Sequence, residues 1–256
     1  MNFFQVIILS VVQGITEFLP ISSSGHLAII QNLFRLTSPP VFFDILLHLG
    51  SVLSIIVFFR KDIVELVKNW QRNLGVWKVI IIGSIPAAIF GYLLNSKIEM
   101  IFGSLTLVGA AMIICGFILL STKFIKKQKE VNELKGISNF KSIIIGLFQA
   151  IAILPGISRS GSTITGGLWQ NLSKEAAFKF SFLLSIPAIL GATLLKAKDA
   201  NFGEVSILAS IMAIFISALV GFFALKFLEK TLKSDKFWLF SIYCFVVGIS
   251  VLVFIK

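Results

Sequence analysis

Two short motifs in this chain combine the residue types that phosphate chemistry uses. Residues 21–25 read Ile-Ser-Ser-Ser-Gly, and residues 157–161 read Ile-Ser-Arg-Ser-Gly. A serine needs a base, a metal or an oxyanion stabiliser before it can attack phosphorus at neutral pH. The planar guanidinium of Arg159 presents donors that match phosphate oxygens. The two motifs together predict a site that binds and transfers a phosphoryl group.

The first motif is followed directly by a histidine. His26 is close enough in sequence to Ser23 to act as a base, an acid or a nucleophile itself, and Glu17 could orient it or balance its charge. The serine run Ser22–Ser24 could instead form a turn and cap the helix that starts near His26. Both uses are compatible, because the N-terminus of a helix also attracts phosphate.

The second motif surrounds its arginine with small and hydroxyl residues. Ser158, Ser160 and Thr163 offer hydroxyl groups, and Gly156 allows backbone N–H groups to approach an anion closely. Arg159 could also form a structural ion pair with Glu17, which would not exclude phosphate binding. This motif is the stronger indication of a phosphate site.

Two further polar pairs have helical spacing. Gln13 and Glu17 are four residues apart, so both side chains lie on one helix face, where they could hold a divalent cation or a proton, or form a packing pair. Asp44 and His48 have the same spacing. Metal ligation needs more partners than these two, so we expect them to support packing or to line a cavity mouth.

The composition indicates a membrane protein. Hydrophobic residues make up 57% of the 256 residues and charged residues only 14%, against about a quarter in soluble domains. The net charge of +11 does not indicate nucleic-acid binding, because the basic residues cluster in short loops between apolar runs. We expect the apolar N-terminal segment to belong to the mature fold, since no Lys or Arg precedes Arg35. Cys115 and Cys244 lie within apolar runs, which indicates packing rather than a disulfide.

The positions of the apolar runs predict an all-α, polytopic helix bundle with six transmembrane helices. The predicted spans are 42–59, 77–94, 101–120, 176–195, 205–226 and 237–255. Four shorter runs, 3–19, 25–34, 143–154 and 162–169, flank the two motifs in pairs. We expect each pair to form a re-entrant helix hairpin, with two full helices kinked at Pro20 and Pro155 as the alternative.

The order of the runs repeats, which predicts one membrane domain, 1–256, built from two halves, 1–122 and 137–256. A shift of 136 residues places Gln13 on Gln149 and the first motif on the second. Each half has three spans, so the second half must enter the membrane upside down. This inverted-topology repeat places the working site at the midplane between the halves.

The distribution of basic residues predicts the orientation. Seventeen Lys and Arg residues fall on the side of the loops 60–78, 123–141 and 226–236, against five on the other side. The first side is therefore expected to be cytoplasmic, with both termini outside. Residues 62–72 alternate charged and apolar side chains, which favours an interfacial helix.

At residues 13–26 and 155–163 the sequence resembles the undecaprenyl-pyrophosphate phosphatase family of the bacitracin-resistance type, over essentially the whole chain. The resemblance implies a phosphatase that converts undecaprenyl (C55 isoprenyl) pyrophosphate to undecaprenyl phosphate, recycling the cell-wall carrier lipid and conferring bacitracin resistance. It also implies a divalent cation, Mg²⁺ or Ca²⁺, and a site open to the outer face of the bacterial cytoplasmic (inner) membrane. The expected partners are the polyprenyl pyrophosphate and membrane lipids, with a homodimer left open.

The resemblance also implies roles for individual residues. It gives catalytic roles to Glu17, Ser23, His26 and Arg159, with Ser23 favoured over His26 as the nucleophile. The residues implied in substrate binding are Gln13, Ser22, Ser24, Gly156, Ser158, Ser160 and Thr163. Glu17 and Gln13 are the implied metal ligands. Gln13 departs from the family pattern, which often has Glu there, and this puts a two-carboxylate metal site in doubt.

A transporter or flippase of the lipid monophosphate is the alternative function. Inverted repeats with broken helices are also found in transporters. Transport of an anion needs an arginine but has little use for a histidine beside a serine run, so the residues favour the phosphatase.

Overall fold

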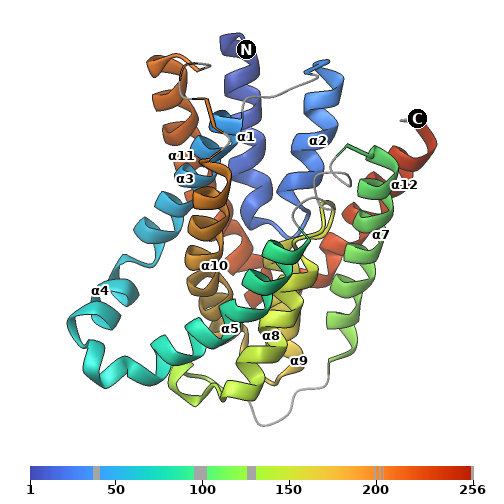
Figure 1. Cartoon of the computed structure of the whole chain (residues 1–256). Coiled ribbons are helices and arrows are strands. Elements are labelled where there is room, and N and C mark those ends of the chain that lie inside the picture. The colour runs from blue at the N-terminus through green and yellow to red at the C-terminus, as the bar shows by residue number, and fades with distance from the viewer. Residues whose placement is uncertain are drawn as a thin grey trace.

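The computed structural model describes residues 1–36, 41–94, 103–125, 131–198, 200–201, 203 and 205–254. Within these residues the protein is a bundle of α-helices (Figure 1), and the one pairing of extended residues is an isolated bridge from Val131 to Leu172. Six of the described helical segments are long and apolar enough to cross a membrane. The predicted all-α membrane bundle with six spans is confirmed.

The first half of the chain begins with a helix hairpin and continues with three long helices. Its elements are α1 (Phe3–Phe18), α2 (Ser23–Leu33), α3 (Val41–Phe58), α4 (Arg60–Lys68), the 3₁₀ turn η1 (Trp70–Asn73), α5 (Leu74–Leu93) and α7 (Leu105–Ser121). Two 3₁₀ turns, η2 (Thr122–Phe124) and η3 (Leu134–Gly136), lie in the connection to the second half.

The second half repeats this order of a hairpin and three long helices. Its elements are α8 (Asn139–Ile151), α9 (Arg159–Trp169), α10 (Lys174–Lys196), α11 (Ile207–Lys233), the 3₁₀ turn η4 (Phe237–Leu239) and α12 (Phe240–Phe254). The hairpin α8–α9 corresponds to α1–α2, as the predicted repeat requires.

Several predicted boundaries differ from the structure by up to four residues, and the end of α11 differs the most. The apolar run 205–226 predicted a span that ends at Lys226, but α11 continues to Lys233. Leu228 and Leu232 stay buried along this extension, and Lys233 forms an i,i+4 ion pair with Glu229. Hydropathy alone ends the span too early, because the last two turns of the helix are amphipathic.

The short helix pairs are hairpins, and the alternative of two kinked spans is wrong. Pro20 has no N–H to continue α1 and restricts Leu19 to an extended conformation, with φ −65° and ψ 145°. In Figure 1, α1–α2 and α8–α9 enter the bundle from opposite ends and their tips meet inside it. A hydrogen bond from the Ser160 Oγ to the Leu19 carbonyl, at 3.4 Å, joins the two tips.

Each hairpin packs against a long helix of the other half, which interlocks the two halves. Helix α1 packs on α11, where Gly14 lies against the backbone of Ser217 and Gly221. The corresponding pair in the second hairpin is α8 on α5, with Gly146 against the backbone of Gly83. Small residues let these backbones approach closely, as is usual between membrane helices.

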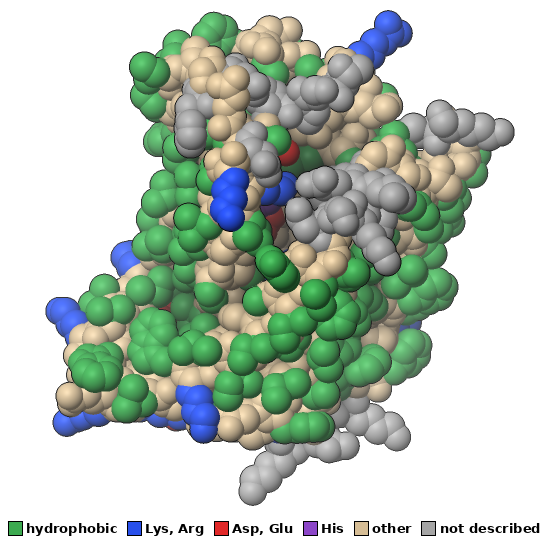
Figure 2. Space-filling model, in the orientation of Figure 1, with side chains coloured by type: hydrophobic (Ala, Val, Ile, Leu, Met, Phe, Trp, Pro, Cys, Tyr) green, Lys and Arg blue, Asp and Glu red, His purple; other side chains and the backbone are tan. Residues whose placement is uncertain are grey.

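The outer surface of the bundle is apolar, and the short helix α4 is amphipathic. Figure 2 shows hydrophobic side chains over the flank of the molecule and Lys or Arg side chains at its two ends. In α4 and η1, the exposed Val64, Val67 and Trp70 alternate with charged side chains. This pattern agrees with an interfacial helix beside a lipid-facing bundle.

Some predictions fall on residues outside those that the structure describes. These are the first two residues of the predicted span 101–120, the last residue of the span 237–255, and five of the counted lysines, Lys97, Lys126, Lys127, Lys129 and Lys256.

Candidate active site

The two hairpin tips are built in the same way, which explains why their motifs look alike. In the first, the Ser22 Oγ accepts the Gly25 backbone N–H at 3.2 Å and lies 3.2 Å from the Ser24 Oγ. In the second, the Ser158 Oγ accepts the Gly161 N–H at 3.1 Å and lies 3.1 Å from the Ser160 Oγ. Ser22 and Ser158 are therefore the N-caps of α2 and α9.

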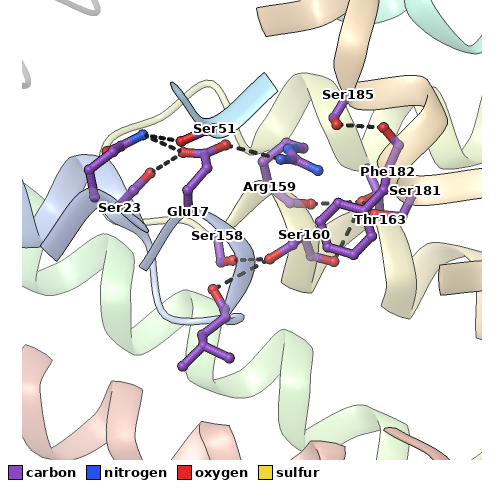
Figure 3. A network of polar contacts seen from close by, with 12 residues as sticks. Glu17, Ser23, Ser51, Ser158, Arg159, Ser160, Thr163, Ser181, Phe182 and Ser185 are labelled. Atoms are coloured by element: carbon purple, nitrogen blue, oxygen red, sulfur yellow. Dashed lines mark hydrogen bonds and ion pairs between the residues drawn. The ribbon is translucent and has the colours of Figure 1, made fainter. Parts of the chain in front are cut away.

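The two motifs differ at the residue that follows the capping serine. Ser23 is the first residue of α2, and Arg159 is the first residue of α9. Both converge on Glu17 near the end of α1 (Figure 3). The Ser23 hydroxyl donates to the Glu17 Oε2 at 2.7 Å, and the Arg159 Nη2 donates to the Oε1 at 3.0 Å.

Gln13 adds a third donor to the same carboxylate. Its Nε2 donates to the Glu17 Oε2 at 3.2 Å and to the Ser51 Oγ of α3 at 3.3 Å. The i,i+4 spacing of Gln13 and Glu17 thus places both side chains on one face, as predicted. Ser51 completes this network.

The ion pair of Glu17 and Arg159 is almost fully enclosed. The exposed fractions of the two side chains are 7% and 14%. The Arg159 guanidinium also lies over the ring of Phe182, 5.4 Å from its centroid. Its Nη1 is buried and has no hydrogen-bond partner among the described residues. A buried donor without a partner costs about 1–3 kcal/mol, so this atom is a good candidate to bind an anion.

The backbone before Ser23 is strained. Ser22 has φ +70°, a conformation that side-chain-bearing residues rarely adopt. Strain of this kind concentrates at functional sites, where the surrounding contacts maintain it. Here the N-cap bond of Ser22 and the bond from Ser23 to Glu17 fix the turn, and they aim the Ser23 oxygen at the carboxylate.

Both ring nitrogens of His26 have hydrogen-bond partners other than Ser23 and Glu17. Its Nδ1 lies 2.7 Å from the Ser22 carbonyl oxygen, and its Nε2 lies 2.7 Å from the hydroxyl of Tyr243 on α12. Within the described part of the chain no hydrogen bond joins His26 to Ser23 or Glu17. Sequence reasoning missed Tyr243, which belongs to no motif and is 217 residues away from His26.

The remaining residues of the second motif mainly hold the hairpin in place. The Thr163 Oγ1 donates to the Arg159 carbonyl at 2.8 Å, and its hydroxyl lies 2.5 Å from that of Ser181 on α10. Gly156 has φ +99°, and a Cβ at this position would collide with the backbone of α7 at Val108. Ser158, Ser160 and Thr163 are all buried.

Asp44 and His48 lie on α3, one helical turn apart. The Asp44 carboxylate accepts the Gln31 Nε2 at 3.4 Å, and the His48 Nδ1 donates to the Asp44 backbone carbonyl at 2.8 Å. His48 is also close enough to Glu17 to interact with it electrostatically. Among the described residues no hydrogen bond joins Asp44 or His48 to Glu17, Ser23 or Arg159.

A cavity of about 580 Å³ opens at another place in the bundle, between α3, α4, α10 and α11. Its lining includes Asp62, Lys174, Lys179 and Lys233, and none of Glu17, Ser23 or Arg159. These charges already form ion pairs, such as Lys179 with Asp62 at 2.6 Å. This cavity is therefore a weaker candidate than the Glu17 cluster for binding an anion.

Comparisons with known proteins identify a family and several similar proteins. The sequence profile of the family described as "Bacitracin resistance protein BacA" matches residues 6–250. A protein of Carboxydothermus hydrogenoformans named undecaprenyl-diphosphatase is 40% identical to this chain, over 99% of this chain and 97% of its own length. Proteins of the same name from Desulfosudis oleivorans and Thermosipho melanesiensis are 39% and 42% identical, over 95% of this chain and 95% and 96% of their own lengths.

Proposed function

We propose that this chain, which belongs to the Bacitracin resistance protein BacA family, is an integral-membrane phosphatase that hydrolyses undecaprenyl diphosphate. The products are undecaprenyl phosphate and inorganic phosphate, so the reaction regenerates the lipid carrier of cell-wall synthesis. Bacitracin resistance fits this activity, as the name of the family implies.

The observation that carries the proposal is the meeting of Ser23, Glu17 and Arg159. A serine hydroxyl bonded to a carboxylate at 2.7 Å is a nucleophile with its base in place. The Nη1 of Arg159 beside it is a buried donor without a hydrogen-bond partner among the described residues. The first turns of α2 and α9 add the positive ends of two helix dipoles at the same point.

The proposed reaction uses these contacts as follows. Glu17 takes the proton of the Ser23 hydroxyl while the Ser23 oxygen attacks the terminal phosphorus of the diphosphate. The bond from that phosphorus to the bridging oxygen breaks, and undecaprenyl phosphate leaves with the bridging oxygen and its electron pair. Water then attacks the phosphoserine and releases inorganic phosphate. Arg159 stabilises the charge on the transferred group, and positioning and electrostatics supply most of the rate.

The contacts favour Ser23 over His26 as the nucleophile. Both ring nitrogens of His26 already have hydrogen-bond partners, Ser22 and Tyr243, whereas the Ser23 oxygen is bonded to a carboxylate that can accept its proton. His26 lies one helical turn after Ser23, from where it acts on the phosphate or on a proton rather than on Ser23 directly.

A divalent cation, Mg²⁺ or Ca²⁺, is part of the proposal. The described residues contain no group of three or more His, Cys, Asp and Glu that could hold a metal. The Oε1 of Gln13 is buried without a hydrogen-bond partner, and amide oxygens suit hard cations. Gln13 and Glu17 would hold the ion together with phosphate oxygens of the substrate, and when bound it would withdraw charge from the diphosphate.

The proposed location is the bacterial cytoplasmic (inner) membrane, with the site open to the outer face. The tips of the two hairpins meet inside the bundle, where Arg159 contacts Glu17 (Figures 1 and 3). In the proposed complex the diphosphate reaches these two residues while the isoprenoid tail stays in lipid. The uneven distribution of basic residues supports this orientation. Association into a homodimer stays a prediction.

A lipid transporter remains the alternative, because hairpins that enter from opposite ends are also found in transporters. The bond from Ser23 to Glu17 favours hydrolysis, since transport of an anion does not need an activated hydroxyl. A liposome assay of lipid flipping with a hydrolysis-deficient variant separates the two activities.

The experiment that tests the proposal is release of inorganic phosphate from undecaprenyl diphosphate by the purified protein in detergent. We expect Glu17→Ala and Arg159→Ala each to lower turnover by about 1,000-fold, since Glu17→Ala removes the proposed base and Arg159→Ala removes the charge stabilisation of the transferred group. The control is Lys179→Ala, which breaks the ion pair with Asp62 at the other cavity and should keep turnover within about twofold. Wild-type-like turnover in Glu17→Ala or Arg159→Ala would contradict the assignment.

A further inference from the structure

Tyr243 holds the motif histidine from a helix at the opposite end of the chain. Its hydroxyl lies 2.7 Å from the Nε2 of His26, and the two rings stack with their centroids 5.6 Å apart and their planes at 16°. Tyr243 takes no part in the proposed transfer of the phosphoryl group. A hydrogen bond combined with stacking fixes both the position and the rotation of the imidazole.

The partner of the other ring nitrogen determines which atom of His26 carries the proton. A carbonyl oxygen can only accept, so the Nδ1 at 2.7 Å from the Ser22 carbonyl must carry the hydrogen. In the neutral ring the Nε2 is then an acceptor, and the Tyr243 hydroxyl donates to it. The phenol thus stabilises the tautomer that carries its hydrogen on the Nδ1 and accepts a hydrogen bond at the Nε2.

Helix α12 is itself anchored to the tip of the first hairpin. The thiol of Cys244, the next residue after Tyr243, donates to the Pro20 carbonyl at 3.5 Å. Helix α12 also packs closely on α7, with Gly248 against the Gly109 carbonyl. The phenol is therefore held in a fixed place relative to Ser22 and Ser23.

We propose that Tyr243 is a positioning residue of the phosphatase site, which keeps the Nε2 of His26 unprotonated and oriented beside the N-terminus of α2. The inference rests on the proposed function. Among the described residues no hydrogen bond joins Tyr243 to Ser23 or Glu17, so it acts through His26. Its hydroxyl, rather than its ring, carries the effect.

The direct test is nitrogen NMR of the purified protein labelled with ¹⁵N-histidine in detergent. The chain has only two histidines, so His48 serves as an internal reference. We expect Tyr243→Phe to shift the Nε2 resonance of His26 toward that of a nitrogen without a donor, while the His48 signals stay in place. Tyr92→Phe removes the other tyrosine hydroxyl of the chain, on α5, and should leave both histidines unchanged. Unchanged His26 signals in Tyr243→Phe would overturn the proposal.

A kinetic test separates positioning from general packing. We expect Tyr243→Phe to lower kcat about 3- to 10-fold, the loss expected for one neutral hydrogen bond, with KM within about twofold. In a His26→Asn background the same substitution should have no further effect, because the hydroxyl then has no imidazole to orient. Independent, multiplying losses in the double variant would show a packing role and overturn the inference.

These readouts also distinguish this inference from the proposed function. The NMR test needs no turnover and can be repeated in Ser23→Ala. A wild-type protein that releases no phosphate would contradict the phosphatase, whereas an unshifted His26 signal beside normal phosphate release would contradict only the role of Tyr243.

Discussion

At the scale of single residues, the site depends on how Glu17 is surrounded. Three donors, from Gln13, Ser23 and Arg159, converge on its two oxygens. A buried carboxylate is tolerable only when it is paired and hydrogen-bonded in this way. The same contacts that stabilise the charge also hold the Glu17 carboxylate against the Ser23 hydroxyl.

Of these three donors, Gln13 departs from the pattern of the family that the sequence resembles, which often has Glu at this position. We expect Gln13→Glu to lower the Mg²⁺ or Ca²⁺ concentration needed for half-maximal phosphate release, because a second carboxylate would bind a hard cation more tightly than an amide oxygen does. The measurement is a cation titration of turnover after chelation. An unchanged half-maximal concentration would mean that the cation does not contact this position.

The sequence allowed several of these residues to be identified. Charges inside an apolar chain are costly, so Glu17 and Arg159 were recognisable as functional, and their ion pair was one of the open alternatives. The partner of His26 could not be predicted. Tyr243 lies in an ordinary apolar helix, and only the packing of α12 against the first hairpin brings it to the site.

At the scale of elements, the two hairpins place Ser23 and Arg159 on opposite sides of one carboxylate. Each tip needs a capping serine, and the second also needs Gly156, whose backbone conformation and contact with α7 leave no room for a side chain. The close approach of α7 thus sets the position of the turn that carries Arg159.

Substitution of this glycine should therefore affect both stability and turnover. We expect Gly156→Ala to lower the Tm and to reduce phosphate release at least about 10-fold, since a methyl group would displace the tip from α7. Gly191→Ala on α10 is the matched control, because no atom lies near the added methyl group. A Tm and turnover in Gly156→Ala equal to those of Gly191→Ala would contradict this account of the turn.

Hairpins could be predicted from short apolar runs that flank proline, glycine and serine, and the structure confirms them. The end of α11 could not be predicted from the sequence, because its final turns are amphipathic and an apolar run does not extend over them. Element ends of this kind depend on tertiary contacts, here the burial of Leu228 and Leu232.

At the scale of the whole molecule, the two halves interlock so that neither contains a complete site. The first half supplies Ser23 and Glu17, the proposed nucleophile and base, and the second supplies Arg159, the proposed phosphate clamp. The sequence repeat predicted this arrangement, since three spans in each half require opposite orientations. Which helices pack on each other, such as α1 on α11, could not be predicted from the sequence and is seen in the structure.

The proposed orientation leads to a labelling experiment in intact cells. We expect a membrane-impermeant maleimide to label Lys198→Cys, beyond the end of α10, and to label Lys135→Cys only after the cells are opened. The native Cys115 and Cys244 are fully buried and should give little background. Labelling of Lys135→Cys alone in intact cells would show the reverse orientation.

The most direct test of the central claim, that Ser23 attacks the terminal phosphorus, is phosphate release from undecaprenyl diphosphate by Ser23→Ala. The matched control is Ser10→Ala on the same hairpin, where a buried hydroxyl has one hydrogen bond within the described residues, to the Val6 carbonyl of its own helix. We predict that Ser23→Ala loses at least about 1,000-fold in turnover, as removal of a nucleophile does, while Ser10→Ala stays within about twofold of the wild type. Turnover in Ser23→Ala equal to that in Ser10→Ala would contradict the mechanism.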